Sequence, residues 1–375
     1  MAIERRGFLT ATTAGLGALA LSRFVAAGIA GRPRLAGCFR DTEGDHLAML
    51  SDDGIAVARV RLPGRGHGMA QRPLTGEVVV FARRPGTFAL ALDPESSEIV
   101  ARIDSIAGHH FQGHGAFSAD GRYLFTAENH YAKEGRGVVG NHDAADGYKR
   151  VGRFDAHGVG ICDLALMPDG KTLALANGGI LTHPGSGRAK LNLATMIPSL
   201  AYVETASGRL LADYRLAPES HQASIRHMAV NAEGTVVVFQ YAGAKTWLVP
   251  LVGIHAGEDA IQLPAAPEAV TAHMRHYCGS VASEPAGRRF AVTSPRGNLA
   301  TFWDAAERKF LAAAEIADVC GAAAAGRDGR FYLASGAGGM VDALAAEGRA
   351  RPLAAAWLGC VKWDNHLLAL APLPA

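Results

Sequence analysis

The sequence predicts an all-β fold, a seven-bladed β-propeller, and three observations support this prediction. Residues 117–125 join two apolar runs through Asp120-Gly121, which is the strongest short-range signal of a β-hairpin. Similar turns recur at spacings of 42 to 64 residues, and further hairpins, such as the one at Gly208, lie between them. Four short strands in a repeat of this length are typical of a propeller blade. The recurring turns lie at Gly76, Gly121, Gly170, Gly234, Gly287 and Gly329.

Residues 1–30 are predicted to form an export signal that precedes the propeller. Arg5-Arg6 is followed by Phe8-Leu9 and then by an apolar run that ends at Leu21. This pattern is typical of a twin-arginine signal, and the run is too short to span a bilayer. We therefore expect export to the periplasm by the twin-arginine route, with no membrane association once the signal is removed.

The two ends of the remaining chain are predicted to share the seventh blade. We expect residues 355–370 to supply its inner strands, and residues 35–62, with a turn at Gly54, to supply its outer strands. A blade built from both ends closes the ring and leaves no open sheet edge. Because no Pro/Ser-rich or charged linker appears, residues 31–375 are predicted to form a single propeller domain of the WD40/YVTN-like kind.

The composition narrows the classes of partner. Apolar residues make up 49% of the chain, which is ample for a packed core. Outside residues 1–30 the basic and acidic residues balance, and no block of like charge appears. Nucleic acid and anionic membranes are therefore not expected partners. The five cysteines contain no Cys-x-x-Cys pair, so no disulfide framework is predicted.

Polar residues recur on the strand that begins each predicted blade. Counting back seven or nine residues from each turn glycine reaches one face of this innermost strand, beside the central channel. Histidine, cysteine and aspartate are ligands of transition metals, so these positions are candidates for a metal site that holds iron or copper. The alternative is a wet channel in which the side chains bind only water and backbone. The candidates are His67, His114, Asp163, His227, Cys278, Cys320 and, in the last blade, Cys360.

The second strand of each hairpin ends at the same rim, which makes its loops a second candidate site. The longest polar insertion follows Asn177 and carries a histidine and two cations on a glycine-rich loop. Loops on a rigid scaffold commonly carry binding residues, and the cations favour an anionic group such as a carboxylate or phosphate. The alternative is a solvated crossover. The candidate ligand-binding residues are Glu128, Asn129, Asn177, His183, Arg188, Lys190, Asn192, Arg226 and Arg296.

Motifs of the common catalytic classes are missing from the sequence. It contains no Gly-x-Ser-x-Gly elbow, His-Glu-x-x-His, Walker loop or dinucleotide fingerprint. Glu128 and His114 are predicted to lie on one rim and have the chemistry for acid and base roles. An enzyme, either a hydrolase or a redox protein, that uses this pair is therefore an alternative function.

Several motifs spread over the mature chain carry a resemblance to a known family. They include Gly-His-Gly-Ala-Phe-Ser-Ala-Asp-Gly at 113–121, Ala-Asn-Gly-Gly-Ile at 176–180, Ser-Ile-Arg-His at 224–227 and Trp-Asp-Asn-His-Leu at 363–367. Together with the twin-arginine start they resemble the exported propeller-like proteins catalogued as domain of unknown function 1513. The resemblance implies a part in iron acquisition, because members are encoded beside periplasmic iron-uptake components, but it implies no defined activity.

The leading hypothesis is therefore a periplasmic propeller that binds a small ligand, a metal ion or a metal complex as an accessory to iron uptake. Its expected partners are periplasmic iron-uptake proteins. A scaffold that only docks those proteins is a further alternative.

Overall fold

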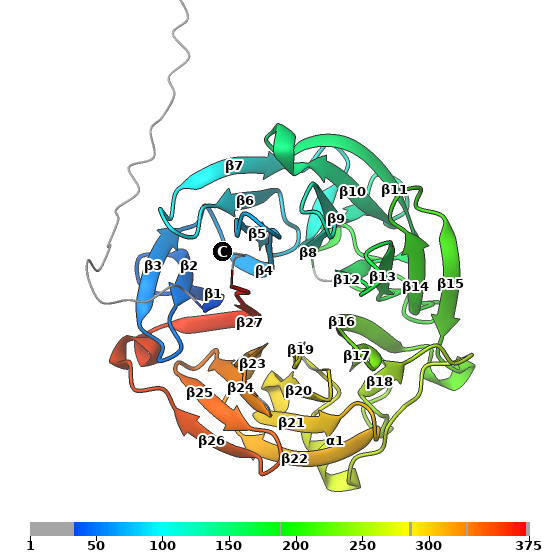
Figure 1. The fold of residues 1–375 in the computed structure, drawn as a ribbon. Helices are drawn as coiled ribbons and strands as arrows, with labels where there is room; N and C mark the ends of the chain where they lie inside the picture. Colours follow the sequence, from blue (N-terminus) through cyan, green and yellow to red (C-terminus); the bar gives the residue numbers. More distant parts are fainter. Residues whose placement is uncertain (1–33, 188, 285–286, 328, 373–375) are drawn as a thin grey trace, which may run out of the picture.

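The computed structural model describes residues 34–187, 189–284, 287–327 and 329–372. Within these residues, seven antiparallel sheets stand around a central axis (Figure 1). The predicted seven-bladed propeller is confirmed. The proposed signal at residues 1–30 lies outside the described residues.

Blades one to three follow one another along the chain, each with four strands, and the first strand of each lies nearest the axis (Figure 1). Blade one holds β4 (Gly66–Gln71), β5 (Val78–Ala82), β6 (Phe88–Leu92) and β7 (Ile99–Asp104). Blade two holds β8 (His110–Phe117), β9 (Tyr123–His130), β10 (Arg136–Asp143) and β11 (Lys149–Val159). Blade three holds β12 (Ile161–Leu166), β13 (Thr172–Asn177), β14 (Ser199–Glu204) and β15 (Leu210–Arg215).

Blades four to six continue the ring, and blade four differs because its described sheet has three strands. Blade four holds β16 (Ala223–Asn231), β17 (Gly234–Tyr241) and β18 (Val252–His255). Blade five holds β19 (Ser280–Ser283), β20 (Arg289–Ser294), β21 (Leu299–Asp304) and β22 (Lys309–Glu315). Blade six holds β23 (Val319–Ala324), β24 (Arg330–Ser335), β25 (Met340–Leu344) and β26 (Arg349–Pro352).

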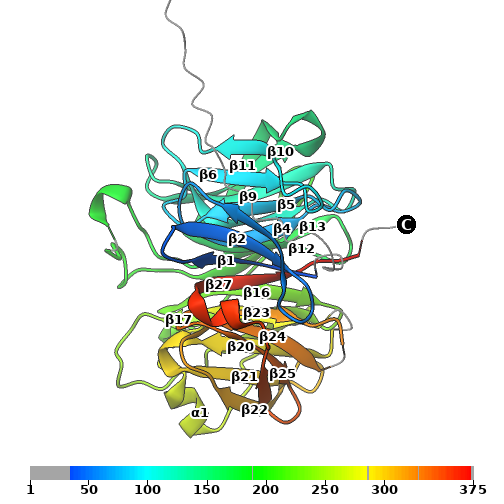
Figure 2. The same cartoon turned by 90° about the vertical axis from the view of Figure 1, so that its left-hand side faces the viewer.

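Blade seven is built from both ends of the chain, as predicted. Its inner strand is β27 (Lys362–Ala369), which pairs with β1 (Leu35–Arg40); β2 (Asp45–Leu50) and β3 (Ala56–Arg61) complete the sheet. Figure 2 shows this blade from the side. The expected bounds of the inner segment were wrong in part, because residues 356–360 form a 3-10 helix and β27 is the single inner strand.

Short helices lie in the connections between strands. The α-helix α1 (Glu268–His273) follows β18, and its chain segment continues to blade five. The 3-10 helices are η1 (Ala144–Asp146), η2 (Pro184–Ser186), η3 (Pro218–Ser220), η4 (Pro295–Gly297) and η5 (Ala356–Cys360). In the described part of the chain, no helix has the length and apolar character needed to cross a membrane.

Burial explains why these segments form the blades. The second strands are almost wholly buried; β5, with the sequence Val-Val-Val-Phe-Ala, is buried at every position because both its faces pack against neighbouring blades. Outer strands such as β15 are half-exposed. At the predicted hairpin turn, Gly121 has a φ of 68°, a left-handed conformation that favours glycine. The glycine-containing hairpin turns and the buried strands together determine the fold of each blade.

Candidate metal centre

The inner strands are interrupted by β-bulges close to the propeller axis. The pairing register shifts between Phe111 and Gly115 in β8, between Ile161 and Asp163 in β12, and between Ile225 and His227 in β16. Similar shifts occur in β4 between Gly66 and Met69, and between β1 and β27 opposite residues 364–366. A bulge breaks the alternation of side chains along a strand and redirects one of them. A histidine or an aspartate lies within or at the edge of each of these bulges.

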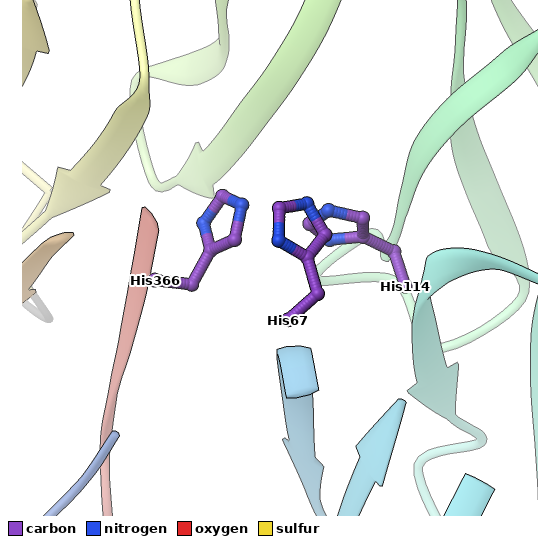
Figure 3. Close-up of side chains that lie close together, drawn as sticks. All are labelled: His67, His114 and His366. Carbon is purple, nitrogen blue, oxygen red and sulfur yellow. The ribbon is translucent and has the colours of Figure 1, made fainter. Parts of the chain in front are cut away.

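Four histidines from four blades meet at these bulges; we call His67, His114, His227 and His366 the histidine cluster. The ring centroid of His366 lies 4.5 Å from that of His67, 4.7 Å from that of His114 and 4.5 Å from that of His227. The His67 and His114 centroids are 5.0 Å apart. Figure 3 shows the rings of His67, His114 and His366 turned toward one another. The blades thus bring together side chains that are up to 299 residues apart in sequence.

Neighbouring polar groups hold the Nδ1 side of three of these rings. His67 Nδ1 donates to Asp364 Oδ1 at 3.2 Å, and His114 Nδ1 lies 3.1 Å from Asp163 Oδ1. His366 Nδ1 lies 3.3 Å from Ser280 Oγ. Such partners fix the orientation and tautomer of an imidazole and leave Nε2 to bind a ligand.

The two carboxylates are themselves held in place. Asp364 also contacts the guanidinium groups of Arg65 and Arg83. Burial alone would raise the pKa of Asp364, but the hydrogen bond from His67 and the nearby arginines hold it well below its ordinary value. Asp163 accepts hydrogen bonds from the backbone N–H groups of Leu164 and Met228. Both side chains are therefore held in place behind the rings.

Buried imidazole nitrogens in the cluster lack hydrogen-bond partners within the described residues. They are Nε2 of His114, Nδ1 of His227 and Nε2 of His366. Burial lowers the pKa of His67 to about 4, and burial together with the neighbouring histidines holds the pKa values of His227 and His366 well below the ordinary range. These three rings are therefore neutral at neutral pH, which is the form that binds metals. Unsatisfied buried nitrogens are costly in a protein interior unless a ligand uses them.

Glycines beside the histidines allow the inner strands to approach one another at the axis. A Cβ on Gly68 would collide with the carbonyl oxygen of Gly113 and lie 2.9 Å from His114 Nδ1. Gly113 has a φ of 99°, and a Cβ there would lie 2.6 Å from His67 Cδ2. Gly68 and Gly113 are thus explained by close packing of β4 against β8.

A cavity of about 240 Å³, which we call the axial cavity, opens beside the cluster. His67, His114 and His227 line one part of it. Five cations line it as well: Arg83, Arg84, Lys190, Arg226 and Arg296. The cavity therefore combines imidazole side chains with cationic side chains.

The structure brings four of the predicted metal residues together and adds one that the sequence count missed. His67, His114, Asp163 and His227 all lie at the axis, and two overlapping sets, His67/His114/His366 and His114/Asp163/His227, each place three ligand atoms within 4.8 Å of one another. His366 was missed because its strand pairs with the N-terminal strand, so no hairpin glycine follows it. The Trp-Asp-Asn-His segment at 363–366 was the available signal.

The three predicted cysteines do not lie in the histidine cluster, which corrects their expected placement. Cys278 is fully buried in the hydrophobic core, where burial raises the pKa of its thiol to about 12. Cys320 is also buried in the core, with its Sγ 3.2 Å from the carbonyl oxygen of Asp364. Cys360 lies exposed in η5 rather than on an inner strand. For Cys320 a bulge explains the error, because the register shifts between Val319 and Gly321 and positions two apart no longer share a face across it.

The predicted ligand-binding residues separate into two groups. Lys190, Arg226 and Arg296 line the axial cavity. Asn129 and Asn177 are buried, and they donate hydrogen bonds to the carbonyl oxygens of Thr182 and Ala156, respectively. Asn192 forms hydrogen bonds with the backbone of Leu181 and Gly179. His183 is the exposed N-cap residue of η2. These four, like Glu128, are not among the residues that line the axial cavity. Arg188 lies outside the described residues.

Glu128 belongs to a separate network within blade two, so the suggested Glu128/His114 pair is wrong. Arg150 donates to both carboxylate oxygens of Glu128, at 2.7 and 3.0 Å. His109 Nδ1 donates to Oε2 at 3.0 Å, and Thr126 Oγ1 donates to Oε1 at 2.8 Å. Burial alone would raise the pKa of Glu128, but the hydrogen bonds and the arginine hold it well below its ordinary value. A carboxylate so fully paired is a structural anion.

Comparison with known proteins supports the fold and names no activity. The family model for proteins of unknown function DUF1513 matches residues 60–370. No curated protein matches the chain. Among solved structures, hydrazine synthase from Kuenenia stuttgartiensis is similar, with a TM-score of 0.57 and 14% identity over 78% of this chain and 86% of that chain. At this identity the likeness shows the fold alone.

Proposed function

The chain belongs to the family of proteins of unknown function DUF1513, and from that premise we propose that it binds a transition-metal ion at the propeller axis. One observation carries the proposal. His67, His114 and His366 each offer a ligand atom within 4.8 Å of the others, and Nε2 of both His114 and His366 is buried with no hydrogen-bond partner in the described part of the chain. The proposed ligands are these three imidazoles.

The spacing of the ligand atoms is close to what one ion requires. Imidazole nitrogens bind Zn²⁺ at about 2.1 Å, so two nitrogens on one ion lie at most about 4.2 Å apart. A separation within 4.8 Å therefore needs only small side-chain movements. Imidazole suits zinc, copper, iron and nickel, and the neutral cluster disfavours hard ions such as Mg²⁺ and Ca²⁺, which prefer oxygen.

His227 and Asp163 have supporting roles in this proposal. The His227 ring is 5.3 Å from His114 and 4.5 Å from His366, centroid to centroid, which makes it the candidate fourth ligand. Asp163 orients His114 and also accepts a backbone hydrogen bond from blade four. Asp364 orients His67 in the same way.

The wider role we propose is an accessory function in iron acquisition in the periplasm. The twin-arginine start at Arg5-Arg6 supports export of the folded protein, and a histidine site suits iron or copper. Periplasmic iron-uptake proteins are the proposed partners. Metal content of the exported protein under iron-replete and copper-replete growth distinguishes the two ions.

Metal titration of the purified, chelator-treated protein tests the binding site directly. We expect one Co²⁺ or Zn²⁺ per chain by equilibrium dialysis with elemental analysis. His67→Ala, His114→Ala and His366→Ala should each abolish stoichiometric uptake, whereas His273→Ala, at an exposed histidine on α1, should leave it unchanged. Absence of uptake by the wild-type protein for zinc, cobalt, copper and iron would overturn the proposal.

A metal-dependent hydrolase or redox enzyme is the second candidate function. It is favoured by the axial cavity, which reaches His67 and His114 and gives a bound ion room for a water or substrate. Metal-loaded protein should then hydrolyse activated esters or phosphoesters, or show a reversible redox wave with copper or iron. If the metal-loaded protein does neither, metal binding remains as the proposed function and the enzyme is contradicted.

A further inference from the structure

The axial cavity carries a strong positive charge beside the histidine cluster. Lys190 comes from the connection between β13 and β14, Arg226 from the bulge of β16, and Arg296 from η4. We call these three residues the cationic wall. No carboxylate is among the cavity-lining side chains of the described residues. The wall faces a space of about 240 Å³.

Bringing these cations together is unfavourable unless an anion is bound. Burial, followed by the charges of Lys245, Arg226, Arg296 and Arg84, lowers the pKa of Lys190. Like charges that converge on one cavity repel one another, and solvent screens part of this repulsion at the exposed Lys190 and Arg296. The repulsion becomes attraction when an anion occupies the space.

Two residues of the cationic wall are held in place by neighbouring residues. The Arg296 guanidinium lies over the ring of Tyr277, 4.5 Å from its centroid. The Tyr277 hydroxyl accepts a hydrogen bond from Asn365 Nδ2 at 3.3 Å, and Asn365 directly precedes His366. Arg226 directly precedes His227. Arg226 is thus linked to the histidine cluster through the chain, and Arg296 is linked to it through Tyr277 and Asn365.

We propose that the axial cavity binds a small oxyanion, through carboxylate or phosphate oxygens, that bridges the cationic wall and the metal ion. The inference rests on the proposed metal site and adds its co-ligand. Guanidinium and ammonium groups are the usual partners of such oxygens, and oxygens fill the positions on the ion that three imidazoles leave open. The protein, the metal ion and the anion then form one ternary complex.

The size of the cavity limits the anion. A water molecule occupies about 30 Å³ of liquid volume, so the axial cavity has room for roughly eight waters. Inorganic phosphate and short dicarboxylates fit inside this space. Neutral donors at the cavity, Gln112 and Gln240, complete a site for a polar ligand.

Calorimetric titration of anions into metal-free and Co²⁺-loaded protein tests the inference. We expect inorganic phosphate or succinate to bind the Co²⁺-loaded protein at least about tenfold more tightly than the metal-free protein. Absorption spectra of the Co²⁺-loaded protein should change when the anion is added. Comparison of the two anions shows whether phosphate or carboxylate oxygens are preferred. Lys190→Gln and Arg226→Gln should each reduce the metal-dependent enhancement below about twofold. Lys171→Gln, at an exposed hairpin turn, is the matched control and should retain it.

The outcomes separate this inference from the metal proposal. Failure of the protein to take up Co²⁺ overturns both. Uptake of Co²⁺ with equal anion affinity in the loaded and metal-free proteins, or with no anion binding, overturns the ternary complex and leaves the metal site intact. An enhancement that persists in Lys190→Gln, Arg226→Gln and Arg296→Gln also overturns the assignment of the wall.

Discussion

Asp364 shows how a single residue outside the ligand set controls the proposed centre. It accepts a hydrogen bond from His67 and is held by Arg65 and Arg83. A carboxylate in this position fixes the imidazole ring and increases its basicity toward a metal. Asp364 is therefore a positioning residue.

Asp364→Asn is expected to weaken Co²⁺ binding by about 10- to 100-fold, the usual cost of losing an outer partner of a metal ligand. The amide keeps the shape of the side chain and removes its charge. The Co²⁺ absorption bands should shift as well, because the His67 ring is no longer held by an anion. Asp342→Asn, which removes a carboxylate paired with Arg330 in blade six, is the control. Equal affinities and spectra in wild-type and Asp364→Asn proteins would contradict the assignment.

Glu128 illustrates the opposite case, a buried charge that serves stability. Because the pKa of Glu128 is lowered in the folded protein, its contribution to stability is fully present above the ordinary value of 4.5 and is lost as the pH falls below it. Glu128→Gln leaves Arg150 without its anion, and such a loss costs roughly 3–5 kcal/mol.

Urea unfolding at pH 7 and at pH 3.5 measures this effect. The difference in unfolding free energy between wild-type and Glu128→Gln proteins should be largest at pH 7 and should narrow by about 1.4 kcal/mol per pH unit below 4.5. Glu219→Gln, at an exposed position in η3, should show no such difference. A gap that stays constant with pH would contradict a role for the Glu128 charge.

At the scale of the strand, the hairpin glycines predicted the blades well, and the bulges limited the site prediction. Counting seven residues back from Gly121, Gly170 and Gly234 reaches His114, Asp163 and His227, which meet at the axis. The same count reaches Met69 in β4, where His67 is the axial residue, because the bulge between Gly66 and Met69 shifts the register. No sequence pattern indicates where a bulge will turn a side chain.

Long-range pairing explains the other differences. His366 is paired with the opposite end of the chain, so a local count could not place it. Cys278 occupies the position equivalent to Ile161 and Ile225 before the bulge, and it is buried like them. The count from Gly287 and the chemistry of a thiol made Cys278 a ligand candidate, whereas the structure places it in the core.

Gly113→Ala tests the close approach of β4 and β8. The substitution introduces a Cβ at a φ of 99° and against the His67 ring. We expect a loss of about 1–3 kcal/mol in unfolding free energy and at least a tenfold loss of Co²⁺ affinity, because His67 must move. Gly152→Ala in β11, where an added Cβ has open space, should change stability by less than about 0.5 kcal/mol. Unchanged metal affinity in Gly113→Ala would show that the strand spacing does not set the site.

For the whole molecule, the closure of the ring and the proposed metal site depend on the same strand. β27 joins the two ends of the chain in blade seven, and it carries His366. The other proposed ligands, His67 and His114, lie on the inner strands of blades one and two. An ion bound by all three would link the closing blade to its neighbours across the axis.

Metal binding should therefore stabilise the entire propeller. An ion that binds only the folded protein adds about 2.7 kcal/mol at a free concentration 100 times its Kd, so thermal unfolding should shift upward by several degrees. His366→Ala should unfold at the same temperature with and without Co²⁺, whereas His273→Ala should keep the wild-type shift. Scanning calorimetry of the metal-free and Co²⁺-loaded proteins measures both. A metal-dependent shift that survives in His366→Ala would place the ion elsewhere, because the proposed site includes His366 as a ligand.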